Sequence, residues 1–109
     1  MRDNLINMPK VLRPLCRLLE IVAECHGVTI EEVLADGREG ARVEARIMFC
    51  YMANKEFGLS SVRIGKLIGR THATVLSNVA SFQKKLDTIR YVKWAYDMVM
   101  EEITKELEK

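Results

Sequence analysis

Residues 60–77 hold two short helical patterns separated by a single glycine, and this arrangement restricts the fold more than any other feature of the chain. Ser60 or Ser61 can cap the first helix, and Gly69 suits the left-handed conformation in which many helices end. Thr71 can then cap a second helix. Two short helices joined by a tight turn that contains glycine form a helix-turn-helix. The segment therefore predicts this motif.

Apolar residues follow helical spacing in the rest of the chain too, and the strict alternation typical of strands is scarce. Thr29 and Glu32 form a capping-box pattern for a short helix, and residues 36–40 (DGREG) form the obvious loop. The expected helices are one that ends at Cys25, followed by those over 30–35, 43–54, 60–68, 72–86 and 92–107. The sequence thus predicts a single all-α domain over residues 1–109, with about six helices and a helix-turn-helix at about 60–86.

Three of these helices carry an apolar face that we expect to form the core. The faces comprise Val43, Ile47, Cys50 and Asn54 in the third helix, widened by Met48, Tyr51 and Met52, then Val75, Leu76 and Val79 in the second helix of the motif, and Val92, Ala95, Tyr96, Val99, Ile103 and Leu107 in the last helix. Trp94 and Met98 lie outside the last of these faces. Because one core accounts for the apolar faces and no extra heptad seam remains, we expect a monomer or a weak dimer.

The composition fits a compact intracellular domain. Of the 109 residues, 49% are hydrophobic and 29% are charged with mixed signs, which suffices for a core and argues against disorder. No apolar run approaches the ~18 residues of a membrane span, so we expect a soluble cytoplasmic protein with no membrane partner. Cys16, Cys25 and Cys50 lack metal-ligand spacing, which predicts free thiols rather than a disulfide or a metal site.

Basic charge is concentrated in the segment that holds the motif. Residues 38–93 carry eleven basic and four acidic side chains, whereas the two flanking segments together carry six basic and eleven acidic ones. Such a distribution is typical of nucleic-acid binding, although ordinary clustering on a solvated surface produces the same count. Arg42 and Arg46 are candidates for phosphate contacts, and Arg46 can instead pair with Glu44 or Glu39.

The residues of the motif, SSVRIGKLIGRTHATVLSNV, resemble the signature of the carboxy-terminal DNA-binding domain (domain IV) of the bacterial replication initiator DnaA. The shared pattern is Ile-Gly in the first helix and Gly-Arg-x-His-x-Thr-Val-Leu at the start of the second. Upstream, IVAECHGVTIEEVLADGRE and ARIMFCYMA also resemble this family, so the resemblance covers roughly residues 18–103. It implies a stand-alone domain of this fold, more distantly similar to the Trp repressor, that binds double-stranded DNA.

Three departures from the family pattern distinguish this chain. Thr71 stands where the family has an acidic residue that reads a base, and Ala73 stands where it has Ser or Thr. A single Gly69 shortens the turn by one residue, and Ile47 replaces a glutamine that contacts phosphate in the family. The departures leave the fold inference intact, but they imply a preferred DNA sequence different from that of the initiator.

The start of the second helix is where we expect base recognition, because these residues of the motif meet base edges in the major groove. His72 is the first candidate for a base contact, because its side chain could reach a base edge or pack on a thymine methyl group. The alternative is that His72 is a capping-region histidine that faces water. Thr71 caps the helix or bonds DNA, and Thr74 contacts DNA or bonds back to its own turn. Ala73 belongs to the same interface, and Ser77 lies at the edge of the footprint.

Phosphate contacts are expected from Lys66, Arg70 and the helix start at Ser60 and Ser61. A helix N-terminus presents unpaired donors and the positive end of a dipole, and both attract phosphate. Arg38 lies in the glycine-flanked loop, where the resemblance implies a basic residue that enters the minor groove. A narrow, negatively charged groove suits such an arginine, and the alternative is a solvated loop residue.

Enzyme function finds no support in the sequence. His26 and His72 are the only histidines, and neither lies at metal-ligand spacing from a cysteine or carboxylate. The sequence has no nucleophile elbow, no P-loop and no Rossmann glycine pattern. We therefore expect no metal, no cofactor and no hydrolysis of ATP of the kind that a complete initiator performs.

The resulting hypothesis is sequence-specific binding of double-stranded DNA in the control of replication or transcription. One alternative is a small phage-type transcriptional regulator that acts as a dimer. A second is a helical protein–protein interaction module that kept the fold, lost tight DNA binding and docks on a replication or regulatory protein through its acidic last helix. Binding to duplex DNA that falls steeply with salt favours the DNA binders, and no binding at low salt favours the interaction module.

Overall fold

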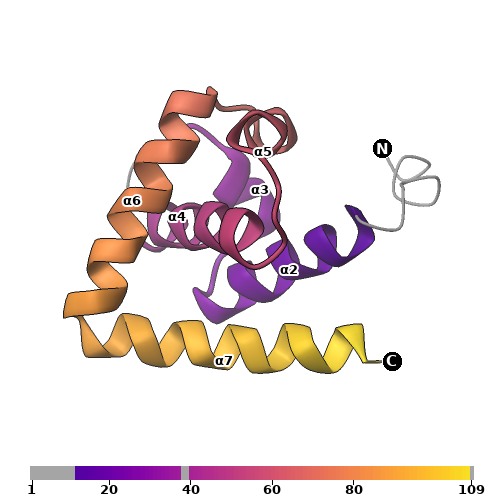
Figure 1. Ribbon diagram of the computed structural model, residues 1–109, viewed down its shortest axis with the longest axis vertical. Coiled ribbons are helices and arrows are strands. Elements are labelled where there is room, and N and C mark those ends of the chain that lie inside the picture. Colours follow the sequence, from indigo (N-terminus) through magenta and orange to yellow (C-terminus); the bar gives the residue numbers. More distant parts are fainter. Residues whose placement is uncertain (1–11, 38–39, 109) are drawn as a thin grey trace.

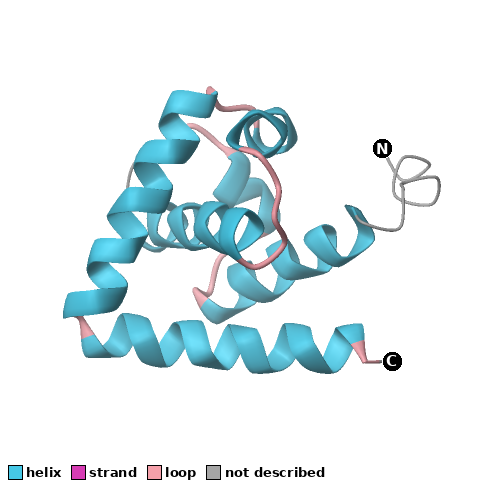
Figure 2. Ribbon diagram, viewed as in Figure 1, coloured by secondary structure: helices cyan, strands magenta, loops and turns pink. Residues whose placement is uncertain are grey.

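The computed structural model describes residues 12–37 and 40–108 of the chain (Figure 1). Figure 2 shows that the described part consists of helices and the short turns between them. The helices are α2 Leu12–Cys25, α3 Ile30–Leu34, α4 Gly40–Lys55, α5 Ser61–Ile68, α6 His72–Thr88 and α7 Arg90–Leu107. Over the described residues, this arrangement confirms the predicted all-α bundle with its helix-turn-helix, α5 and α6.

Helix α4 lies at the centre of the bundle and is buried on all sides. All residues from 45 to 53 are buried, and the helix packs against α2, α3, α5 and α6. The predicted face, widened by Met48, Tyr51 and Met52, matches buried residues but was still too narrow, since Phe49 outside that set is also buried. A helix that is apolar around its whole circumference needs partners on every side, and the bundle supplies them.

Polar caps fix where α3, α5 and α6 begin, and a glycine fixes where α5 ends, as the sequence predicted. The Thr29 hydroxyl accepts a hydrogen bond from the Glu32 amide at 3.1 Å, and the Glu32 carboxylate accepts one from the Thr29 amide at 2.9 Å. This pair completes the predicted capping box. Ser60 and Thr71 cap the two helices of the motif, and Gly69 ends α5 with a φ of +70°, a conformation that a β-carbon disfavours.

Helix α7 closes the bundle at the end opposite to the turn of the motif (Figure 1). It packs along α2 and against α6, and it buries Val99 and Ile103. Phe82 of α6 and Tyr96 of α7 both pack on Tyr51 of α4, with ring centroids 4.9 and 6.0 Å from the Tyr51 ring. These contacts hold the second half of α6 in the core and leave its first turns at the far end of the bundle.

Two residues predicted for the core lie on the surface instead. Leu76 is 52% exposed, because the buried side of α6 is defined by Val75 and Val79 and Leu76 lies about 100° further round the helix. Leu107 is 56% exposed, because it is the last residue of α7 and lies beyond the buried Ile103. The position of Leu76 matters for function, since α6 is the predicted recognition helix.

Candidate nucleic-acid interface

Helix α6 begins with an exposed, capped turn. The Thr71 hydroxyl accepts a hydrogen bond from the Thr74 amide at 3.2 Å and lies 3.0 Å from the Thr74 hydroxyl, so the two threonines hold this turn together. Both threonines are exposed, and so are His72, Ala73 and Ser77. The structure thus places these predicted site residues together on the accessible first turns of the helix.

Helix α5 presents the second part of the predicted interface. The Ser60 hydroxyl accepts a hydrogen bond from the Arg63 amide at 3.2 Å, so Ser60 is the cap, and Ser61 is the first residue of the helix. The side chains of Arg63 and Lys66 are exposed on this helix, which packs against α6. Two basic side chains and a helix N-terminus therefore lie beside the exposed start of α6.

The turn of the motif depends on a close approach between Gly65 and Arg70. A β-carbon at Gly65 would lie 2.4 Å from the backbone carbonyl oxygen of Arg70. The Arg70 amide also donates a hydrogen bond to the Gly65 carbonyl oxygen at 2.9 Å. Since only glycine leaves room for this approach, Gly65 allows the chain to pass directly from α5 into α6.

The side chain of Arg70 is hydrogen-bonded to the backbone of two segments. Its guanidinium donates to the carbonyl oxygens of Leu34 and Ala35, after α3, at 3.4 and 2.7 Å. It also donates to those of Ile68 and Gly69, at the end of α5, at 3.2 and 3.3 Å. The sequence predicted only a phosphate contact here. The structure shows that Arg70 also ties the turn of the motif to the loop after α3.

Arg46 holds the same loop from α4. Only 7% of Arg46 is exposed, and its guanidinium donates to the carbonyl oxygens of Val33, Ala35 and Gly37 at 2.7, 2.7 and 3.2 Å. Burial and the nearby positive charge of Arg70 both lower the pKa of Arg46. The hypothesis of an exposed phosphate contact was therefore wrong for Arg46, because the loop carbonyls already engage its donors.

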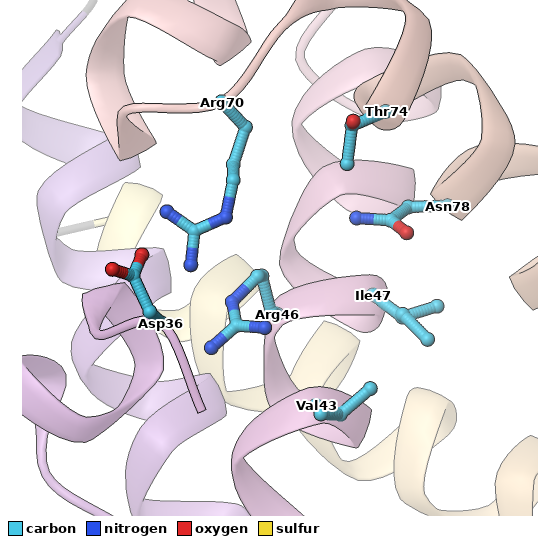
Figure 3. Close-up of a pocket in the computed structure, with 7 residues that line it drawn as sticks. All are labelled: Asp36, Val43, Arg46, Ile47, Arg70, Thr74 and Asn78. Carbon is cyan, nitrogen blue, oxygen red and sulfur yellow. The ribbon is translucent and has the colours of Figure 1, made fainter. Parts of the chain in front are cut away.

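Figure 3 shows both guanidinium groups in a pocket beside the start of α6, pointing toward the loop that carries Asp36. The pocket has a volume of about 420 Å³. Thr74 and Asn78 line its α6 side, and Val43 and Ile47 line its α4 side. The pocket thus brings two guanidinium groups, the Asp36 carboxylate and two polar side chains together next to the exposed first turns of the motif.

Arg38 lies outside the residues that the structure describes, so its contact with the minor groove stays a prediction. Gly37, the residue before it, is hydrogen-bonded by Arg46. On the other side of the loop, the Arg42 guanidinium lies 3.6 Å from the Glu32 carboxylate. Arg46 therefore anchors the end of the loop at Gly37, and the Arg42–Glu32 pair joins the start of α4 to α3.

Replacing Arg70 with lysine should lower the free energy of unfolding by about 1 kcal/mol, because one ammonium group cannot hold the carbonyl oxygens of two segments. Urea unfolding followed by circular dichroism measures this change. Arg63→Lys is the matched control, because Arg63 is an exposed arginine of the same motif, and it should leave the stability unchanged. If Arg70→Lys were as stable as the unchanged protein, Arg70 would act only as a positive charge.

Metal sites, membrane-spanning helices and reactive thiols in the described residues would point to other functions. No group of three or more His, Cys, Asp or Glu side chains among them could hold a metal ion. None of the helices over 12–37 and 40–108 is long and apolar enough to cross a membrane. Cys50 is buried, and this burial raises the pKa of its thiol, which keeps it protonated and unreactive.

The sequence analysis missed two features of this interface. The exposure of Leu76 could have been predicted from helical spacing, because a helix whose buried side holds Val75 and Val79 places Leu76 at the margin of that side. The contact between Arg70 and Ala35 could not have been predicted, because it joins residues 35 positions apart and arginine–carbonyl bonds leave no periodic pattern in a sequence.

Comparison with known proteins gives one family. The family model for the bacterial dnaA protein helix-turn-helix matches residues 16–81. The chromosomal replication initiator protein DnaA of Thermotoga petrophila is 32% identical over 100 residues, which make up 91% of this chain and 23% of that protein. DnaA 1 of Chlamydia pneumoniae is 32% identical over a match that covers 70% of this chain and 16% of that protein. DnaA of Thermotoga maritima is 35% identical over a match that covers 73% of this chain and 18% of that protein. The chain therefore spans less than a quarter of the length of each relative.

Proposed function

Since the chain belongs to the family of bacterial DnaA helix-turn-helix domains, we propose that it binds double-stranded DNA with α6 in the major groove. The observation that carries this proposal is the exposed start of α6, where Thr71, His72, Ala73, Thr74 and Ser77 lie together. In a helix-turn-helix, these positions meet base edges. Such contacts require exposed side chains, and the cap at Thr71 holds the turn that carries them.

The DNA backbone is held by the cationic surface around this turn. Lys66 is exposed on α5, and the N-terminus of that helix begins at the Ser60 cap. The N–H groups of a helix start and basic side chains are common phosphate ligands. Arg70, which is partly exposed in the pocket on the other side of α6, adds positive charge there. Arg38 extends the interface into the minor groove under this proposal.

The preferred DNA sequence differs from that of the relatives. Thr71 offers a hydroxyl in place of the carboxylate implied by the family pattern, and its oxygen already accepts from the Thr74 amide. Ala73 offers a methyl group in place of a hydroxyl. Each altered base contact changes the binding free energy by about 1–3 kcal/mol, which is enough to redirect specificity.

The relatives are named as chromosomal replication initiator proteins. The proposal for this chain is a role in the control of replication or transcription, in the cytoplasm at the nucleoid. Binding needs no ATPase activity, metal or cofactor, and one monomer provides a complete motif in α5 and α6.

Affinity for random-sequence duplex DNA at increasing salt concentration tests this function. The logarithm of the binding constant should fall linearly with the logarithm of the salt concentration, because phosphate neutralisation releases counterions. Lys66→Ala should flatten the slope by roughly one unit. Lys105→Ala, which removes an exposed lysine from α7, should leave the slope unchanged. No binding at low salt, or equal effects of both variants, would overturn the proposal.

A second candidate function, docking on another protein, is supported by the surface of α7. Tyr91, Trp94 and Met98 are exposed there, and Trp94 is the most exposed of the three, at 65%. Pockets of about 460 and 340 Å³ both include Trp94 in their lining. This surface lies on the helix at the end of the bundle opposite to the turn of the motif, so docking there is compatible with DNA binding (Figure 1).

A further inference from the structure

We infer that Leu76 reads thymine, by packing its side chain against the thymine methyl group in the major groove. The inference rests on the proposed function and specifies which bases the site favours. Leu76 is a large apolar side chain, 52% exposed, on the predicted recognition helix.

No exposed residue in the first turns of α6 is of a type that usually reads bases through two hydrogen bonds, and the one amide there, Asn78, is only partly exposed and donates to the Cys50 sulfur at 3.6 Å. The exposed residues from 72 to 80 are His72, Ala73, Thr74, Leu76, Ser77 and Ala80. None of them is Arg, Lys, Asn or Gln, the residue types that make paired bonds to guanine or adenine. The Thr71 and Thr74 hydroxyls are also hydrogen-bonded to each other. Apolar contact is therefore a source of direct recognition that this surface offers beside His72 and Ser77.

Leu76 is the largest member of an apolar strip on the exposed side of the helix. Ala73, Leu76 and Ala80 are spaced by three and four residues, which places them on neighbouring turns of one face. Val75 and Val79 occupy the buried side. A groove-facing strip of this kind presents methyl groups along about two turns of helix.

Thymine offers the matching chemistry. Its C5-methyl group lies in the major groove, where apolar side chains contact it, and none of the other three bases carries such a group. Packing against Leu76 removes the methyl group and part of the leucine from water together. Loss of one buried methyl group is worth ~0.8 kcal/mol, which corresponds to about a fourfold change in affinity.

Replacing thymine with uracil tests the inference, because uracil pairs with adenine in the same way and lacks only the methyl group. A preferred duplex is first selected from a random-sequence library with the unchanged protein. Each thymine of that duplex is then replaced singly by uracil. The affinity of each duplex is measured for the unchanged protein, for Leu76→Ala and for Leu107→Ala. The last variant is the matched control, since it removes a leucine of similar exposure from α7.

At one or more positions, uracil should weaken binding of the unchanged protein and of Leu107→Ala about fourfold and leave binding of Leu76→Ala unchanged. Circular dichroism should show the same helix content for all three proteins. If every replacement affected Leu76→Ala as much as the unchanged protein, or affected neither, the inference would be wrong and DNA binding would stand. If no duplex were bound at low salt, the proposed function would fall, and this inference with it.

Discussion

Gly65→Ala is expected to lower the free energy of unfolding by about 1–3 kcal/mol, although alanine is the better helix former. The added β-carbon would lie 2.4 Å from the carbonyl oxygen of Arg70, so either α5 or the turn must shift. A shift there also displaces the capped start of α6 that Thr71 forms. Urea unfolding gives the change in stability, and binding to duplex DNA should weaken in the same variant.

The adjacent residue provides a control for this prediction. Lys66→Ala places the same side chain at the next position of α5, where the residue is exposed. It should leave the stability nearly unchanged. A Gly65→Ala protein as stable as the unchanged one would show that the turn does not need the close approach of α5 to Arg70.

His72→Ala is expected to weaken binding to the preferred DNA sequence by about 1–3 kcal/mol and to change the affinity for random sequence little. His72 is exposed in the first turn of α6, where it supports little packing, so the melting temperature should stay the same. Affinities for a selected duplex and for a random duplex, together with thermal unfolding, measure all three quantities in one variant.

The second histidine of the chain is the matched control. His26 follows α2 and is half-buried, and its Nδ1 atom lies 2.8 Å from the carbonyl oxygen of Val22 in that helix. His26→Ala should therefore leave both DNA affinities unchanged. A His72→Ala protein that melted earlier would make His72 a structural residue, and equal losses on both duplexes would make it a phosphate contact.

The local signals in the sequence predicted the helices and their ends well. The capping box at Thr29 and Glu32, and the caps at Ser60 and Thr71, depend on residues three positions apart, so the sequence contains the whole interaction. The exposed start of α6 followed from the same signals, together with the resemblance of the motif to a known family.

Contacts between distant segments could not be predicted in this way. Arg46 and Arg70 share the Ala35 carbonyl oxygen, and nothing in the charge pattern distinguishes them from exposed arginines such as Arg63. The exposure of Leu76 likewise depends on how far α5 and α4 reach around α6. Helical periodicity gives the direction of a buried face but leaves its width undetermined.

Nuclear magnetic resonance titration of the isotope-labelled chain with a random-sequence duplex at low salt locates the surface that binds DNA residue by residue. If α6 enters the major groove, the largest amide shifts should lie at residues 60–66 and 70–77, and residues 91–98 of α7 should be unaffected. Shifts that gathered around Trp94 and Met98 and left the start of α6 unchanged would contradict binding through α6.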